Sequence, residues 1–258
     1  MSGDYLESTQ HKYWTFTKNE LINIRKLDAP YARIRLFLGE QLNLLGLKLN
    51  CRQRVVSTAQ VFLSRTFLKI RLEDMNLYLV TATCLYMASR AEEQQLHARI
   101  VVREAAKLWP RMMPTETSYL AECEFYLLEE LRTCLVIYHA YNPLIRISKE
   151  YDLTPDEFQA AWEAINDASL CDIPLLFSPK VIAFAAMFMV LILRPELDGG
   201  RTPLAIKNRL DILSVSIGRR STLDLTQLAY CIQEFLSLYS LMESINRRSV
   251  ANEIEQLL

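Results

Sequence analysis

Glycine is scarce in this sequence, and its absence from a long central stretch counts against one broad class of fold. The chain has 258 residues but only six glycines, and none of them lies between Leu47 and Asp198. Tight β-hairpins depend on glycine in their turns, so this gap disfavours a β-rich protein. Apolar residues instead recur three and four positions apart, as in Val55–Leu63. This spacing is typical of helices that bury one face, so we expect an all-α fold.

An excess of charge of either sign is also missing. The chain carries 29 Lys and Arg against 30 Asp and Glu, for a formal net charge of −1. A protein that grips nucleic acid needs a basic excess to neutralise phosphates, so we expect no direct nucleic-acid contact, although a local basic patch would not show in this sum. The hydrophobic fraction of 51% is enough for a sizeable core.

No cysteine pair has the spacing of a metal site. The sequence contains no C-x-x-C, and most of its six cysteines lie in apolar stretches. We therefore expect reduced, buried thiols, as in a cytosolic or nuclear protein, rather than a disulfide framework or a zinc site. The N-terminus Met1-Ser2-Gly3-Asp4 does not resemble the start of a signal peptide.

Long hydrophobic runs are absent as well. The run Val181–Leu193 is wholly apolar but is flanked by Lys180 and Arg194. It is shorter than the roughly 18–20 residues that span a bilayer, so we interpret it as a buried core helix and expect no membrane segment.

Motifs of catalysis are missing. There is no H-E-x-x-H, no phosphate-binding loop and no G-x-G-x-x-G, and none of the three histidines has a glutamate three positions before it. The neighbouring carboxylates Glu92-Glu93 and Glu129-Glu130 would point about 100° apart on a helix. We expect no catalytic residues, no metal and no cofactor.

Helix starts are well marked. Thr154-Pro155-Asp156-Glu157 predicts a capping box, and Asn142-Pro143, Ser178-Pro179 and Thr202-Pro203 repeat its cap-then-proline pattern. Asp74 and Ser221 are further candidate caps. The periodicity predicts helices over the following ranges: 10–16, 18–27, 30–46, 53–69, 74–92, 97–107, 115–135, 142–151, 155–171, 179–194, 203–215, 222–243 and 246–257.

Two stretches suggest an internal repeat. Leu79–Met87 aligns with Val181–Met189, and each is the most apolar stretch of its half of the chain. Helices that are apolar all round must be surrounded by others, which favours two bundles that meet near Tyr138–Tyr141. The pattern alone leaves open the alternative that any two buried helices look alike.

Four polar features stand out, and solvation is the simplest interpretation of each. They are Ala88–Glu93 at the end of an apolar helix, the pair Glu122 and Glu124, the pair Asn166-Asp167, and the doublets Arg219-Arg220 and Arg247-Arg248.

Taken together, these pieces resemble the cyclin family. The similarity is carried by Ala59-x-x-Phe62-x-x-Arg65, by Met87-Ala88-Ser89-Arg90-Ala91-Glu92-Glu93 and by Glu124. The stretches Glu122–Tyr141 and Ala161–Asp167, with Tyr13-Trp14, are similar to the cyclin C-like group. The resemblance covers nearly the whole chain.

The resemblance implies a division into four parts. Residues 1–29 would form an N-terminal helical segment, 30–140 a first five-helix cyclin box, 141–243 a second one, and 244–258 a C-terminal helix. It implies a nuclear regulator without catalysis of its own. Its partners would be the cyclin-dependent kinase of the Mediator complex and other subunits of the Mediator kinase module, in regulation of RNA polymerase II transcription.

The resemblance also implies where a kinase would bind. Arg90 and Glu124 would form a charged pair facing the kinase, and Leu128 and Leu135 would add apolar contacts. A second partner surface would comprise Asn166, Asp167 and Tyr239.

Two departures from the family pattern bear on function. Arg90 stands where the family usually has lysine, and arginine prefers forked contacts. Ala32-Arg33-Ile34-Arg35-Leu36 and Gly39 replace the substrate groove of cell-cycle cyclins and its tryptophan, which favours a transcriptional cyclin.

Three other interpretations remain open. They are a DNA-binding transcription factor with two cyclin folds, a helical enzyme with an unrecognised site, and a scaffold subunit that binds other proteins of a transcription complex without activating a kinase.

Overall fold

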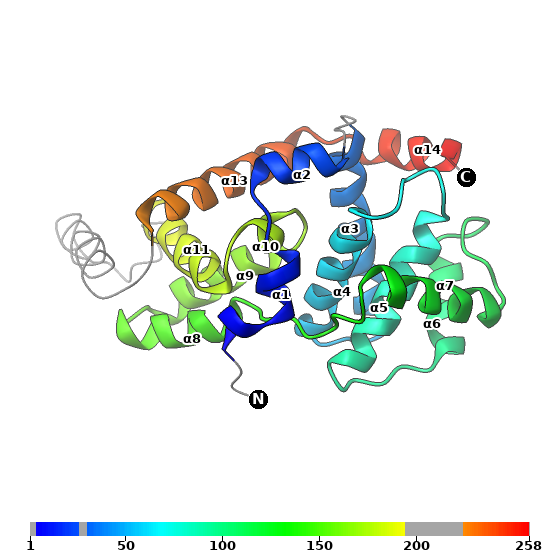
Figure 1. Cartoon of the computed structure of the whole chain (residues 1–258), viewed down its shortest axis with the longest axis horizontal. Helices are drawn as coiled ribbons and strands as arrows, with labels where there is room; N and C mark the ends of the chain where they lie inside the picture. Colours follow the sequence, from blue (N-terminus) through cyan, green and yellow to red (C-terminus); the bar gives the residue numbers. More distant parts are fainter. Residues whose placement is uncertain (1–3, 26–29, 194–223, 258) are drawn as a thin grey trace. The chain divides into compact units, whose positions relative to one another are not determined.

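The computed structural model describes residues 4–25, 30–193 and 224–257, and this part of the chain is helical without any strand. Figure 1 shows the helices along the chain. Their bounds are η1 (Tyr5–Glu7), α1 (Thr9–Trp14), α2 (Lys18–Arg25), α3 (Pro30–Lys48), α4 (Gln53–Thr66), α5 (Leu77–Ala91), α6 (Ala98–Leu108), α7 (Thr117–Glu130), α8 (Tyr141–Glu150), α9 (Pro155–Ala168), α10 (Ile173–Leu176), α11 (Pro179–Leu193), α13 (Leu225–Ser244) and α14 (Arg247–Leu257). The expected all-α class is confirmed.

The predicted capping box at the start of α9 is present. The Thr154 backbone N–H donates to Glu157 Oε2 at 2.7 Å, and the Glu157 N–H donates to Thr154 Oγ1 at 3.2 Å. At the start of α11, Ser178 Oγ accepts from the Val181 N–H at 3.4 Å. Each side chain satisfies a backbone N–H that has no partner within its own helix, which explains why the helices begin at these residues.

Two predicted caps are wrong. The fifth helix is capped by Asn76 instead of Asp74, because Asn76 Oδ1 accepts from the backbone N–H groups of both Tyr78 and Leu79 at 3.0 Å. Helix α8 begins at Tyr141, one residue before the expected cap Asn142. Its proline lies in the first turn, where the missing N–H costs no helical hydrogen bond.

Some predictions lie outside the described residues, and two short helices were not predicted. Ser221, Thr202-Pro203, Arg219-Arg220 and the helix over 203–215 all lie in the part that the structure does not describe. The short helices η1 and α10 carry too few residues to show a periodicity.

The described chain forms two compact units. The first comprises Met1–Ile137 with Ser169–Leu176 and Leu241–Leu258, and the second comprises Tyr138–Ala168 with Phe177–Ser240. In the first unit α5 packs against α3, α4, α6 and α7 (Figure 1). Most of α5 is buried, as its apolar sequence predicts for a central helix.

The apolar run near residue 181 forms the central helix of the second unit. Helix α11 packs against α8 and α9, and almost every residue from Pro179 to Leu191 is buried. The prediction of a buried core helix is therefore confirmed. Among the described residues, no helix has the length and hydropathy needed to cross a membrane.

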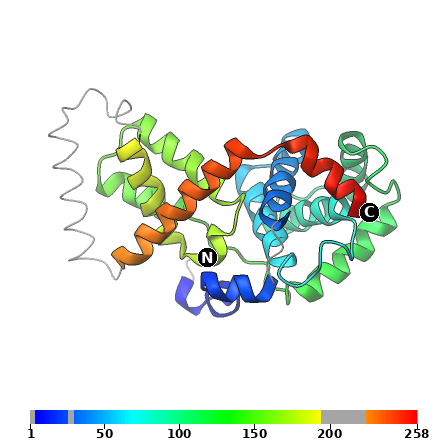
Figure 2. The same cartoon turned by 90° about the horizontal axis from the view of Figure 1, so that it is seen from above.

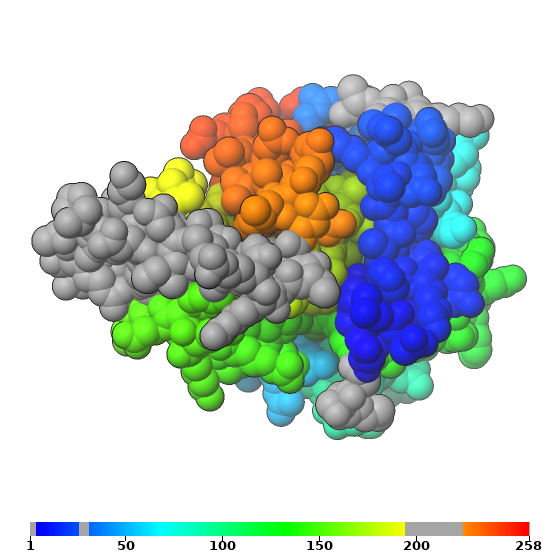
Figure 3. Space-filling model, turned by 60° about the vertical axis from the view of Figure 1, so that its left-hand side comes forward, coloured from blue at the N-terminus to red at the C-terminus, as the bar shows by residue number. Residues whose placement is uncertain are grey.

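The N-terminal helices are fixed to the first unit by polar and aromatic contacts. Trp14 is 2% exposed, and its ring lies 4.8 Å from the Arg65 guanidinium carbon. The Phe16 backbone N–H donates to the Leu175 carbonyl at 2.8 Å, and Arg25 makes a two-point ion pair with Asp172. Figure 3 shows α1 and α2 as a dark blue strip on the molecular surface.

Two arginines are buried in the first unit without a carboxylate partner among the described residues. Arg35 donates to Ser64 Oγ at 2.8 Å and to the carbonyls of Gln60 and Ser169 at 2.7 and 2.8 Å. Arg65 donates to the Cys134 carbonyl at 2.8 Å. Burial lowers the pKa of both guanidinium groups, because the charged form loses its hydration.

The last helix, α14, belongs to the first unit and packs against α3. Figure 2 shows these two helices in red and blue. Arg247 forms two hydrogen bonds to the Glu40 carboxylate at 2.7 and 2.8 Å. The sequence predicts only solvation for the Arg247-Arg248 doublet, so this ion pair is a correction.

Candidate functional site

The candidate site lies where the end of α5 meets the middle of α7. The two helices pack against each other in the first unit. Arg90 lies in the last turn of α5, where a cation interacts favourably with the negative end of the helix dipole. Most of α5 is buried, and the Arg90 side chain near its C-terminal end is 55% exposed, so its charge reaches solvent.

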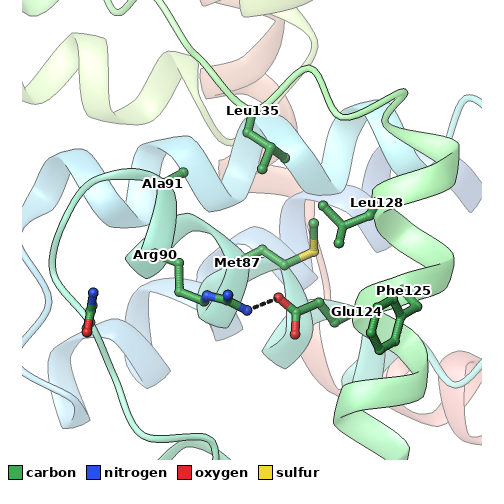
Figure 4. A pocket seen from close by; sticks show the side chains of 8 residues that line it. Met87, Arg90, Ala91, Glu124, Phe125, Leu128 and Leu135 are labelled. Carbon is green, nitrogen blue, oxygen red and sulfur yellow. Dashed lines mark hydrogen bonds and ion pairs between the residues drawn. The ribbon is translucent and has the colours of Figure 1, made fainter.

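Arg90 and Glu124 meet across the two helices. Arg90 Nη1 donates to Glu124 Oε1 at 2.5 Å, as the dashed line in Figure 4 marks. The Arg90 side chain is 55% exposed, whereas that of Glu124 is 15% exposed. The pair predicted from the sequence is therefore formed, with the carboxylate set back between the helices and the guanidinium turned toward solvent.

An unusual turn after α7 brings Leu135 back beside Leu128. Arg132 and Thr133 have positive φ values of 51° and 54°, so the chain reverses over two left-handed residues. The turn is held by a hydrogen bond from the Thr133 N–H to the Leu128 carbonyl at 3.0 Å. Both leucines are half-buried, and in Figure 4 the Met87 side chain lies between them and the charged pair.

These side chains line one hollow of about 500 Å³. Besides the four predicted residues, its lining comprises Met87, Ala91, Gln95 and Phe125. Phe125 is 74% exposed, which is unusual for a large aromatic side chain. Met87 lies three residues before Arg90, so helical spacing places both on the same face of α5 and could have predicted Met87 as part of the site. No pattern in the sequence marked Phe125 as exposed.

The hollow has the chemistry of a docking surface. It offers one cation, one carboxylate and several apolar side chains, and no group of His, Cys, Asp and Glu among the described residues is arranged to hold a metal ion. Burial raises the pKa of the Cys84 and Cys123 thiols, and raises that of Cys51 to about 11, which disfavours the thiolate form of these three cysteines.

The second predicted set lies in the other compact unit, and its members are only half-exposed. Asn166 Oδ1 accepts a hydrogen bond from the Tyr141 hydroxyl at 2.8 Å. The Tyr239 hydroxyl donates to Asp167 Oδ2 at 3.2 Å, and burial raises the pKa of Asp167. Full solvation of Asn166-Asp167, the simplest interpretation of the sequence, is wrong, because both side chains anchor tyrosines.

Comparison with known proteins decides the family. The model of the cyclin N-terminal domain matches residues 5–136, which is more than half of the chain and includes every residue of the hollow. The chain belongs to the cyclin family. Cyclins are regulatory subunits, and this cyclin is similar over its length to proteins named RNA polymerase II holoenzyme cyclin-like subunit.

Two fungal relatives illustrate this similarity. The RNA polymerase II holoenzyme cyclin-like subunit of Yarrowia lipolytica is 35% identical over 280 aligned positions, which cover 100% of both chains. The subunit of the same name from Aspergillus oryzae is 33% identical, with 96% of this cyclin and 94% of the relative covered.

Solved structures show the same fold. A chain in the CAK complex of Chaetomium thermophilum has a TM-score of 0.74 at 15% identity, and the match covers 98% of this cyclin and 87% of that chain. A chain in the yeast TFIIK complex has a TM-score of 0.68 at 20% identity, with 91% and 99% covered.

The structure also gives a physical reason for the departure at Gly39. A Cβ atom at this position would lie 2.9 Å from both Arg35 Nη1 and Leu170 Cδ2. A tryptophan, which the cell-cycle cyclins carry here, would therefore displace a buried arginine and a buried leucine.

Proposed function

We propose that this cyclin is the activating, non-catalytic subunit of the cyclin-dependent kinase of the Mediator complex, and that it acts in the nucleus on RNA polymerase II transcription. The observation that carries the proposal is the hollow between α5 and α7, where the Arg90–Glu124 pair is bordered by Leu128, Leu135 and the exposed Phe125. The names of the relatives support the link to polymerase.

The chemistry of this hollow suits a kinase helix. A partner protein recognises a surface most specifically where charged groups lie beside apolar contacts that exclude water from the charges. The kinase would bring its αC helix and the neighbouring loop against the hollow. Phe125 would supply a rigid apolar anchor, and the charged pair would select complementary charges on the helix.

Binding alone would activate the kinase. Active kinases pair the lysine of strand β3 with a glutamate of αC, which requires αC to be turned inward. A cyclin that binds only the inward position shifts the kinase toward it by the difference in affinity for the two states. This cyclin needs no catalytic group for that role.

A second surface would connect the cyclin to other subunits of the kinase module. Asn166, Asp167 and Tyr239 are partly exposed, and hydrogen bonds already fix Asn166 and Asp167 in position. Preorganised polar groups lose little conformational freedom when a partner binds. If Asp167→Ala leaves the affinity for every other module subunit unchanged, this surface is not used.

The test is stimulation of the Mediator kinase on a peptide with polymerase C-terminal repeats. Arg90→Ala and Glu124→Lys are expected to lower affinity by about 2–5 kcal/mol, because each leaves one charge unpaired at a desolvated contact. Arg247→Ala is a matched control. The Arg247–Glu40 pair has exposures of 51% and 19%, close to those of the Arg90–Glu124 pair, but lies on α14 and α3.

The outcomes separate the two functions. Loss of stimulation in the Arg90 and Glu124 variants, with normal helicity and normal stimulation by Arg247→Ala, supports an activating cyclin. A well-folded wild-type chain that neither binds nor stimulates the kinase would contradict the proposal and leave the scaffold function as the better explanation.

A further inference from the structure

A second hollow in the first unit is lined by cations. Its volume is about 370 Å³, and its lining comprises Arg99, Val102, Arg103, Ala106, Lys107, Thr115 and Thr117. The first five belong to α6, Thr115 lies in the segment before α7, and Thr117 is the first residue of α7. It shares no lining residue with the hollow between α5 and α7.

The three cations form one row. Arg99, Arg103 and Lys107 follow one another at intervals of four residues, so they lie on the same face of α6 over about 12 Å. Like charges four residues apart destabilise a helix by a few tenths of a kcal/mol per pair. The row concentrates positive charge on one face of α6, and such a face attracts anionic ligands.

The surroundings balance the row only in part. Glu104 Oε1 accepts from Arg103 Nε at 3.1 Å and from Lys107 Nζ at 2.9 Å, and the two cations lower the pKa of this carboxyl. The Arg103 and Lys107 side chains nevertheless remain 64% and 63% exposed. Arg99 is exposed and has no ion-pair partner in the part of the chain that the structure describes.

The remaining lining fits a phosphate group attached to a peptide. Thr115 and Thr117 add two hydroxyl groups to the lining, and the buried Val102 and the half-buried Ala106 add apolar surface that a flanking side chain could contact. Glu116, between the threonines, is exposed and accepts from the Ser118 hydroxyl, so this edge repels an extended run of negative charge.

We propose that this hollow, the α6 pocket, binds a phosphorylated serine or threonine within an extended segment of a partner protein. A phosphate monoester carries a charge of about −1.5 to −2 and three acceptor oxygens, which match two or three cationic donors and neighbouring hydroxyls. Nucleic acid fits less well, because the site has a short row of cations with carboxylates on either side and the chain as a whole is slightly acidic.

The test uses the full chain and a fluorescein-labelled peptide mixture with one fixed phosphoserine and degenerate neighbours. Fluorescence anisotropy should show saturable binding of this mixture and at least about ten-fold weaker binding of the same mixture without phosphate. Arg99→Ala should weaken binding about ten-fold, and the pair of changes Arg99→Ala and Lys107→Ala should abolish it. Alanine favours helix, so neither variant should unfold α6.

Arg71→Ala is the control, because Arg71 is 76% exposed and pairs with a carboxylate away from this pocket. It should leave the affinity for the phosphoserine mixture within about two-fold of wild type. Equal affinity for the mixture with and without phosphate would overturn the proposal. So would loss of binding in Arg71→Ala to the extent seen in Arg99→Ala, or tighter binding of a single-stranded RNA of the same length with the same dependence on Arg99.

Discussion

Exchanging the two charges of the candidate site distinguishes a structural role from a partner-binding role. In the double variant Arg90→Glu with Glu124→Arg, the ion pair between α5 and α7 can form again with its direction reversed. The present pair is short, at 2.5 Å, but Arg90 is 55% exposed. Exposed pairs contribute about 0.2–1 kcal/mol to folding, and a single charge reversal also adds repulsion of similar size, so each one should lower the free energy of unfolding by about 0.4–2 kcal/mol.

The exchange of charges should weaken kinase binding by much more than it changes the stability of the fold. A partner that reads a cation at position 90 and a carboxylate at position 124 meets the opposite charge at each position after the exchange. Mispaired charges at a desolvated contact cost about 2–5 kcal/mol, which corresponds to an affinity lower by about 30-fold or more. The double variant should therefore recover the stability of the wild type in urea denaturation and still fail to bind or stimulate the kinase.

The same exchange at Arg247 and Glu40 serves as the control. This pair has nearly the same exposure as Arg90–Glu124. Exchanging its two charges should therefore also restore the free energy of unfolding in urea, and it should leave kinase stimulation unchanged. If exchanging Arg90 and Glu124 restores stability and stimulation together, the pair acts only within the cyclin, and the reasoning that places the kinase on this face is refuted.

Three further predictions concern the frame that holds the site. Trp14→Ala should destabilise the chain by about 3–5 kcal/mol in urea denaturation, because this buried ring covers Arg65. Gly46→Ala should lower the free energy of unfolding by about 1–3 kcal/mol, since a Cβ atom there would lie 2.6 Å from Val56 Cγ2. The double variant with Val56→Ala should be destabilised by less than the sum of the two single changes, and strict additivity would contradict the clash. Thr154→Ala should cost about 1 kcal/mol through loss of the α9 cap, measurable as a lower urea midpoint with an unchanged slope.

Local chemistry made much of the fold predictable. A capping side chain and a helical hydrophobic period act over a few residues, so the start of α9 and the burial of α11 follow from the sequence alone. The wrong prediction of Asp74 as a cap shows the limit of such local signals. Asp74 and Asn76 are both good caps, and only the path of the preceding turn decides that Asn76 faces the free N–H groups.

Tertiary contacts decided what could not be predicted. The sequence around Arg35 and Arg65 does not show that both guanidinium groups are buried, because their acceptors are mainly carbonyls of residues far along the chain, such as Ser169 and Cys134. In the candidate site, the resemblance predicted Arg90, Glu124, Leu128 and Leu135. It did not predict the left-handed turn after α7, which depends on backbone conformations that side-chain patterns do not encode.

The two matched arginine pairs differ in their surroundings, and the proposal that the first one binds the kinase rests on this difference rather than on charge. Arg90–Glu124 and Arg247–Glu40 are alike in residue types, distance and exposure. The first pair borders a hollow whose lining includes an exposed phenylalanine, Phe125. An exposed ion pair alone binds a partner weakly, because water competes for both charges. An apolar rim that a partner covers removes this competition, so under the proposed function Arg90 and Glu124 would gain both affinity and selectivity from their position between α5 and α7.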